Sequence, residues 1–138
     1  FITRRPRIMA SILRVNTLTD ASSNNSTAMS TINQGTAKAW LNLDGTGTIS
    51  ARDSFNNASV TDNGTGDYTS TITNAMNNDD YLGIVEADVS SVADFAIGCT
   101  DDNSTVRTTT VLRAAVGNTS GQRKDTDTVG ISIHGDLA

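Results

Sequence analysis

The residues that could do chemistry in this chain are few and isolated. His134 is the single histidine and Cys99 the single cysteine of the 138 residues, so a Ser-His-Asp or Cys-His arrangement would have to use one of them. No neighbouring residue pattern supports such a use. We interpret His134 as a surface or subunit-contact residue, and Cys99 as a buried structural thiol. An intermolecular disulfide through Cys99 is the alternative.

Acidic residues are more numerous, but their spacing does not favour a catalytic or metal site. Asp79-Asp80 and Asp101-Asp102 are adjacent pairs, and adjacent residues of a strand point to opposite faces, so their carboxylates do not converge for glycosidase chemistry. Residues 62–67 carry oxygen ligands that calcium could use, but their spacing is not that of an EF-hand loop. Residues 45–47 lack the ending of a phosphate-binding loop. The sequence therefore predicts no catalytic, cofactor-binding or metal-binding residue, and no enzyme.

Trp40, the single tryptophan, is expected on the more polar face of its strand. Strand alternation places one face of this segment in the core and the other outside. The two faces are formed by Ala37, Ala39, Leu41 and Leu43 on one side and by Lys38, Trp40 and Asn42 on the other. Two interpretations of Trp40 stay open: packing under a loop or a partner chain, and a platform for a ligand.

Short alternating stretches separated by turn residues indicate β-strands along most of the chain. The strongest hairpin signal is Asn63-Gly64, where Gly64 is expected to adopt a positive φ. The expected strands are residues 36–43, 47–52, 55–61, 68–73, 81–89, 94–99, 106–116 and 128–134. About eight short strands at this spacing predict an all-β fold, an antiparallel β-sandwich over residues 35–138. Residues 1–34, rich in Ser, Thr and Asn from residue 16 onward, are predicted to be an N-terminal arm or linker.

Composition and charge narrow the choice of partners. Hydrophobic residues make up 36% of the chain, less than is usual for a globular domain, so the core of one copy is expected to be thin and a homo-oligomer is predicted. The net charge is −5, yet the first 14 residues carry only basic charges, at Arg4, Arg5, Arg7 and Arg14. This basic start could dock onto an acidic neighbour or be a solvated tail. Met9 reads like a natural start, which would make residues 1–8 an upstream extension, a processing remnant or a remainder of cloning.

Nucleic acid and membrane are not expected as partners. The body of the chain is acidic and has no basic stripe with interleaved aromatic residues, which argues against nucleic-acid binding. The mainly apolar run near the start, residues 8–13, is far too short to cross a bilayer, so no membrane insertion is predicted.

Three segments resemble a module of bacteriophage tail and tail-fibre proteins. They are KAWLN at residues 38–42, DSFN at 53–56 and TDNGTGDYT at 61–69, in this order. The resemblance covers about residues 37–81. It is weaker in RVNTLTDAS at residues 14–22 and in VGISIHGD at residues 129–136.

The resemblance implies a non-enzymatic virion structural protein, a tail-fibre or tail-tip component located in the extracellular particle. Its expected partners are further copies of the chain, other virion proteins, and a glycan or protein of the host surface. Two other functions stay open: a secreted carbohydrate-binding module, and a subunit of a bacterial surface filament whose N-terminal arm adds a strand to its neighbour. A carbohydrate-binding module usually presents several exposed aromatic side chains, and the chain has one Trp and two Tyr.

Overall fold

The computed structural model describes residues 13–88, 96–100 and 107–138, in two compact units, Phe1–Ile32 and Asn33–Ala138. The candidate turn acids Asp101 and Asp102 and the basic residues Arg4, Arg5 and Arg7 lie outside the described residues, as do residues 1–8. Cys99 lies in a strand, but its side chain also lies outside what the structure describes.

The N-terminal unit, predicted to be an arm or linker, contains regular structure. Strands β1 (Thr17–Thr19) and β2 (Ser26–Ala28) form an antiparallel hairpin, followed by helix α1 (Met29–Gly35). The carboxylate of Asp20 organises the turn, because it accepts hydrogen bonds from the Asn24 backbone N–H at 3.0 Å and from Asn25 Nδ2 at 2.7 Å. Polar residues of this segment bond to the backbone and to one another in the turn, so the predicted arm or linker contains local structure.

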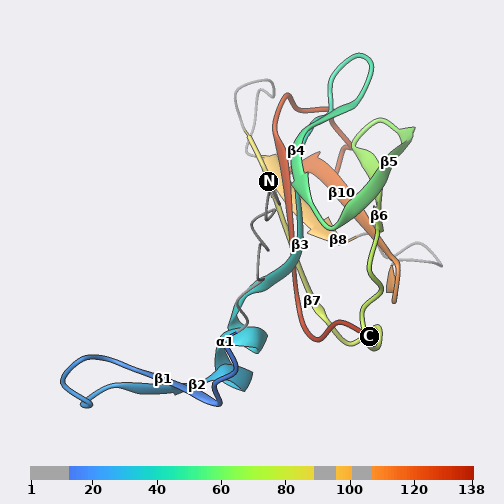
Figure 1. The fold of residues 1–138 in the computed structure, drawn as a ribbon. Coiled ribbons are helices and arrows are strands. Elements are labelled where there is room, and N and C mark those ends of the chain that lie inside the picture. Colours follow the sequence, from blue (N-terminus) through green and yellow to red (C-terminus); the bar gives the residue numbers. More distant parts are fainter. Residues whose placement is uncertain (1–12, 89–95, 101–106) are drawn as a thin grey trace, which may run out of the picture. The chain divides into compact units, whose positions relative to one another are not determined.

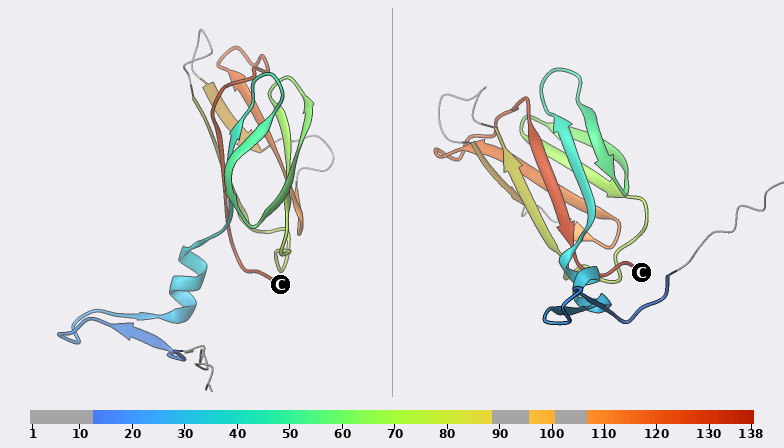
Figure 2. Two further views of the ribbon diagram at one scale, coloured as in Figure 1. Left: turned by 45° about the horizontal axis from the view of Figure 1, so that its top comes forward. Right: turned by 60° about the vertical axis from the view of Figure 1, so that its left-hand side comes forward.

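Residues Asn33–Ala138 form the predicted antiparallel β-sandwich (Figures 1 and 2). One sheet has the order β4-β3-β11-β7, and the other has the order β5-β6-β10-β8 with β9 paired to β10. The strands of the first sheet are β3 (Ala37–Asp44), β4 (Ser50–Phe55), β7 (Leu82–Ala87) and β11 (Val129–His134). Those of the second are β5 (Asn57–Gly64), β6 (Asp67–Ile72), β8 (Ala96–Thr100), β9 (Arg107–Thr108) and β10 (Val111–Asn118). The expected strand at residues 106–116 is therefore divided into β9 and β10.

The core lies between the two sheets and follows the predicted alternation. Leu41 and Leu43 of β3 and Ile131 of β11 are buried against Tyr68 of β6 and Leu112 of β10. The alternate residues of β3 and β11 face outward, as the period of two requires. The first sheet therefore presents one face to the core and the other to the outside.

The hairpin between β5 and β6 forms at the predicted place but turns two residues later. The turn residues are Thr65 and Gly66, whereas Asn63 and Gly64 are still in β5, where the register shifts. Gly64 does have a positive φ of 127°, and Gly66 has a φ of 61°. The turn prediction at Asn63-Gly64 was therefore wrong in position. Asn63 and Gly64 lie at a bulge near the end of β5, and the turn follows them.

A single residue joins the two sheets where β4 ends and β5 begins. Asn56 adopts a left-handed conformation with φ 54°, which Asn tolerates better than most residues. Its side chain donates to the Lys38 carbonyl at 2.9 Å and accepts from the Asn74 backbone N–H at 2.8 Å. Asn56 thus fixes the corner at which the chain passes from one sheet to the other.

Both tyrosines of the chain, Tyr68 and Tyr81, are buried. The Tyr68 hydroxyl lies 3.0 Å from the Gly45 carbonyl oxygen and 3.0 Å from Asp125 Oδ1, and the Tyr81 hydroxyl donates to the Val111 carbonyl at 2.7 Å. Burial raises the pKa of Tyr81 to about 12. Burial also raises the pKa of Tyr68 well above its ordinary value, and the adjacent Asp125 carboxylate adds to this effect.

These raised pKa values predict a loss of stability in alkali. The folded state holds both phenolic protons more tightly than the unfolded chain, whose tyrosines titrate near pH 10. The tyrosine contribution to the free energy of unfolding is therefore complete below pH 10 and declines as the pH rises toward 12. We expect no phenolate absorption from the native protein at about pH 10.5, and full absorption from the urea-unfolded chain at about pH 11.5. Phenolate absorption that rises near pH 10 while the circular dichroism stays native would contradict the buried positions of these side chains.

Candidate functional site

A row of exposed side chains crosses the outer face of the β4-β3-β11-β7 sheet. Trp40 of β3 pairs with Phe55 of β4 on one side and with Ser132 of β11 on the other, and Ser132 pairs with Ile84 of β7. Directly paired residues project to the same face, so these four side chains form one row, which we call the Trp40 row. Phe55 is 53% exposed, Ile84 48% and Trp40 37%. Leu82, 59% exposed, continues the apolar surface along β7.

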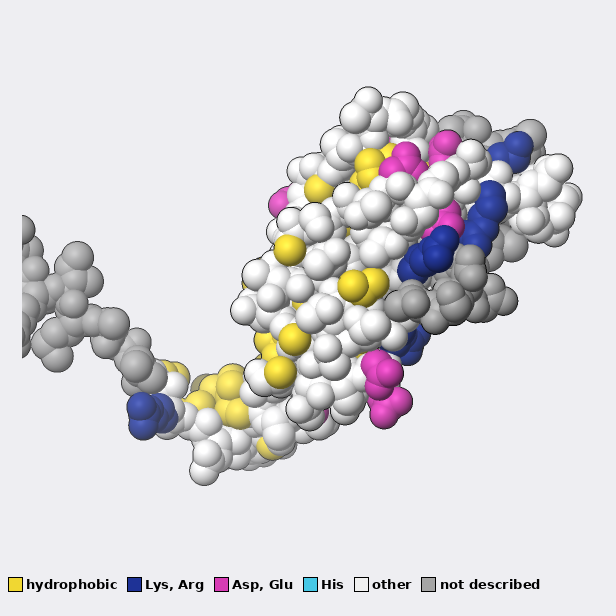
Figure 3. All heavy atoms as spheres, turned by 90° about the vertical axis from the view of Figure 1, so that its right-hand side faces the viewer, with side chains coloured by type: hydrophobic (Ala, Val, Ile, Leu, Met, Phe, Trp, Pro, Cys, Tyr) yellow, Lys and Arg dark blue, Asp and Glu magenta, His cyan; other side chains and the backbone are white. Residues whose placement is uncertain are grey.

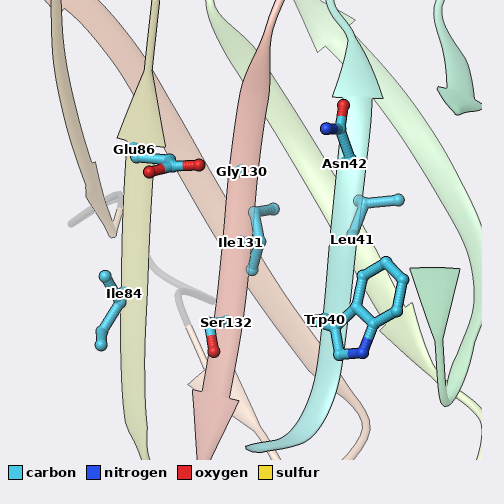
Figure 4. A pocket seen from close by; sticks show the side chains of 8 residues that line it. All are labelled: Trp40, Leu41, Asn42, Ile84, Glu86, Gly130, Ile131 and Ser132. Carbon is cyan, nitrogen blue, oxygen red and sulfur yellow. The ribbon is translucent and has the colours of Figure 1, made fainter. Parts of the chain in front are cut away.

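Three residues of the Trp40 row, Trp40, Ser132 and Ile84, border a shallow hollow of about 350 Å³. Two of the residues around it, Leu41 and Ile131, are buried (Figure 4). The residues around it are Trp40, Leu41, Asn42, Ile84, Glu86, Gly130, Ile131 and Ser132. The hollow therefore combines an indole, an isoleucine and three polar side chains on one sheet face.

Glycine at position 130 leaves room for the Glu86 side chain beside the hollow. Gly130 lies between Asn42 of β3 and Glu86 of β7 in the sheet register. A Cβ at residue 130 would come within 2.4 Å of Glu86 Oε1 and 2.5 Å of Glu86 Cγ. The Glu86 side chain therefore lies across the space that a larger residue would fill, as Figure 4 also shows.

Most of the polar groups around the hollow have no partner among the residues that the structure describes. The Trp40 indole N–H, the Asn42 amide and the Glu86 carboxylate make no hydrogen bond or ion pair with the part of the chain that the structure describes. Ser132 Oγ differs, because it lies 3.0 Å from His134 Nε2. Three groups with full hydrogen-bonding capacity thus remain open to solvent or a ligand.

The outer face of the other sheet has a different character. Figure 3 shows the side of the molecule on which β5 and β6 lie in Figure 1: most of it is backbone or uncharged polar side chains, and Lys and Arg gather beside Asp and Glu. Asp67 and Arg113 form a bidentate ion pair there, with Nε–Oδ1 at 2.8 Å and Nη2–Oδ2 at 2.5 Å. The Arg113 guanidinium lowers the pKa of Asp67. Because these charged groups already satisfy one another, this face is the weaker candidate for a binding site.

The structure gives structural roles to the acids that the sequence raised as metal or catalytic candidates. Asp62 accepts the Gly64 backbone N–H at 2.9 Å within the hairpin, and Asp67 is held by Arg113. Asp79 and Asp80 lie in the loop before β7. Over residues 13–88, 96–100 and 107–138, no three His, Cys, Asp or Glu side chains come close enough together to hold a metal ion.

His134 lies on the outward-facing side of β11 and has Ser132 as its neighbour. Trp40 is 37% exposed and lies beside the hollow. Its indole is therefore accessible to a ligand or to a partner chain. Sequence reasoning missed Phe55, Glu86 and Gly130. The alternation of each strand could place these residues outward, but only the register between strands brings them together.

No helix in the described ranges has the length and apolar character needed to cross a membrane. The chain matches no protein-family model, and neither a curated protein nor a solved structure shows significant similarity to it.

Proposed function

We propose that this chain is a non-enzymatic structural protein of a bacteriophage tail, a fibre or tip component of the virion that works by assembling with other copies of itself and with other virion proteins. One observation carries the assembly role: residues 13–32 form a hairpin and most of a helix, yet none of their side chains is buried. The placement in a phage tail is supported by the resemblance of residues 37–81.

The exposed apolar side chains of this N-terminal unit need a partner to be buried. Leu13 is 80% exposed, Leu18 46% and Val15 37%. A two-stranded hairpin is marginally stable by itself in water, and it gains stability when an apolar face packs against another element. We infer that the partner is a neighbouring copy, on which the hairpin lies in the assembled particle.

Deleting residues 1–34 should therefore convert an oligomer into monomers. Light scattering at micromolar concentration is expected to give a multiple of 14.5 kDa for the full chain and a single-chain mass for the truncated one. Weakening by added salt would identify electrostatic docking of the basic start, whereas salt resistance would identify apolar or strand-pairing contacts. A monomeric full chain, or a truncated chain that assembles equally well, would refute the assembly role.

A separate experiment tests the proposed location in the phage tail. An antiserum against the chain, used with gold-labelled secondary antibody on purified phage particles, should label the tail. Labelling of cell-surface filaments instead of particles would replace the phage assignment with the filament alternative, and the assembly result would still stand.

A further inference from the structure

We propose that the hollow beside Trp40 is a binding site for an uncharged oligosaccharide. This inference goes beyond the assembly role and does not depend on it, because it rests on residues of the Asn33–Ala138 unit alone. A sugar ring has an apolar face made of C–H groups and a rim of hydroxyls. A matching site therefore needs a flat aromatic surface next to free hydrogen-bonding groups.

Trp40 and Phe55 supply the aromatic surface. They are paired across β3 and β4 and are 37% and 53% exposed, so two rings are available side by side on the same face. In Figure 4 the indole is seen broadside from outside the sheet. A ring that presents its face can stack on the apolar face of a pyranose, and two adjacent rings suit consecutive sugar units of one oligosaccharide.

The free polar groups line the same hollow as Trp40. The Trp40 indole N–H is a donor, the Glu86 carboxylate is an acceptor, and the Asn42 amide is both. Asn42 and Glu86 flank Gly130 from the two neighbouring strands. Each sugar hydroxyl is both donor and acceptor, so it can satisfy any of these groups.

The same groups argue against the other occupants of an exposed sheet face. An apolar protein surface would bury the Glu86 carboxylate and the Asn42 amide without partners, which is costly. An anionic glycan would bring its charge next to Glu86 on a protein of net charge −5, which is repulsive. An uncharged oligosaccharide avoids both penalties.

Trp40 provides a direct measurement, because it is the only tryptophan of the chain. We would titrate the full-length protein with chitotriose, maltotriose, cellotriose and mannotriose, and with trigalacturonic acid as the charged comparison. At least one uncharged trisaccharide should change the Trp40 emission along a saturable curve, with a Kd at or below about 1 mM. No change with any uncharged member up to about 10 mM, or a change with the charged member alone, would overturn the proposal.

Matched variants locate the site. Phe55→Ala and Glu86→Gln should each raise the Kd of the bound trisaccharide about tenfold or more, through the loss of one stacking ring and of a charge-assisted hydrogen bond. The control is Thr71→Ala on the β6 strand of the other sheet, which should leave the Kd unchanged. Unaltered binding in both site variants would place the sugar elsewhere and overturn the inference. So would a Trp40 emission that follows protein concentration without sugar, since this would show a second copy on the face.

Discussion

Replacing Gly66 by alanine is expected to destabilise the sandwich more than any other single methyl addition at a turn glycine. Gly66 has a φ of 61°, and a Cβ there would meet the Val116 carbonyl oxygen at 2.2 Å and the Lys124 backbone N and O at 2.7 and 2.8 Å. These obstacles are backbone atoms, which cannot rotate away as a side chain could. The left-handed conformation costs an alanine about 1 kcal/mol, and relieving the clash costs about 2 kcal/mol more. The Tm should therefore fall by about 10 °C.

Gly66 also holds the hairpin to the rest of the fold, so the damage should spread beyond the turn. Its N–H donates to Asp125 Oδ1 at 2.7 Å, and its carbonyl accepts the Val116 N–H at 2.8 Å. The matched control is Gly121→Ala, because Gly121 has a φ of 76° but open space where the Cβ would lie. The Gly121→Ala variant should lose only about 1 kcal/mol of the free energy of unfolding, which is the cost of the left-handed conformation for alanine. Equal losses of Tm in the two variants would show that the packing around Gly66 is not as described.

Replacing Asn56 by alanine should cost nearly as much, about 2–3 kcal/mol, through both conformation and hydrogen bonding. Alanine is strained at the φ of 54° that Asn56 adopts. It also removes the groups that bind the Lys38 carbonyl and the Asn74 amide. Urea unfolding followed by circular dichroism gives the change in the free energy of unfolding.

Two further variants separate these causes. Asn56→Gly removes the side-chain hydrogen bonds but tolerates the conformation, so it should be about 1 kcal/mol more stable than Asn56→Ala. Asn77→Ala is the control, since the Asn77 side chain is exposed and makes no hydrogen bond to the residues that the structure describes. A loss in Asn77→Ala as large as in Asn56→Ala would show that the corner has no special role.

The β-sandwich could be predicted because each strand carries its own signal. In β11 every second residue is apolar and is buried between the sheets, and in β6 the buried alternate residues are Tyr68, Ser70 and Ile72. The Trp40 row carries no such signal. Residues 40, 55, 84 and 132 become neighbours only through the pairing of four strands, and nothing local to any one strand specifies which strand lies beside it.

The conformations at Asn63-Gly64 and in the N-terminal unit have a common physical cause. At Asn63-Gly64 the pair that favours a tight turn is used in a bulge, and Thr65-Gly66 makes the turn because Gly66 is tied to Val116 and Asp125. In the N-terminal unit, polar residues that suggested a linker are held by the Asp20 hydrogen bonds. In both places contacts outside the immediate dipeptide decided the conformation, which local residue preferences do not describe.

The position of β11 has a consequence for the order in which the protein can be made. Residues 129–134 form a central strand, paired with β3 on one side and β7 on the other, although they follow all the other strands in the sequence. During translation β3 and β7 leave the ribosome before β11. Until β11 has also left it, each of these two strands has an unpaired edge where β11 will bind. Completion of this sheet must therefore be a late step of biosynthesis. A ribosome that stalls before residue 129 would leave a chain prone to pair with its neighbours.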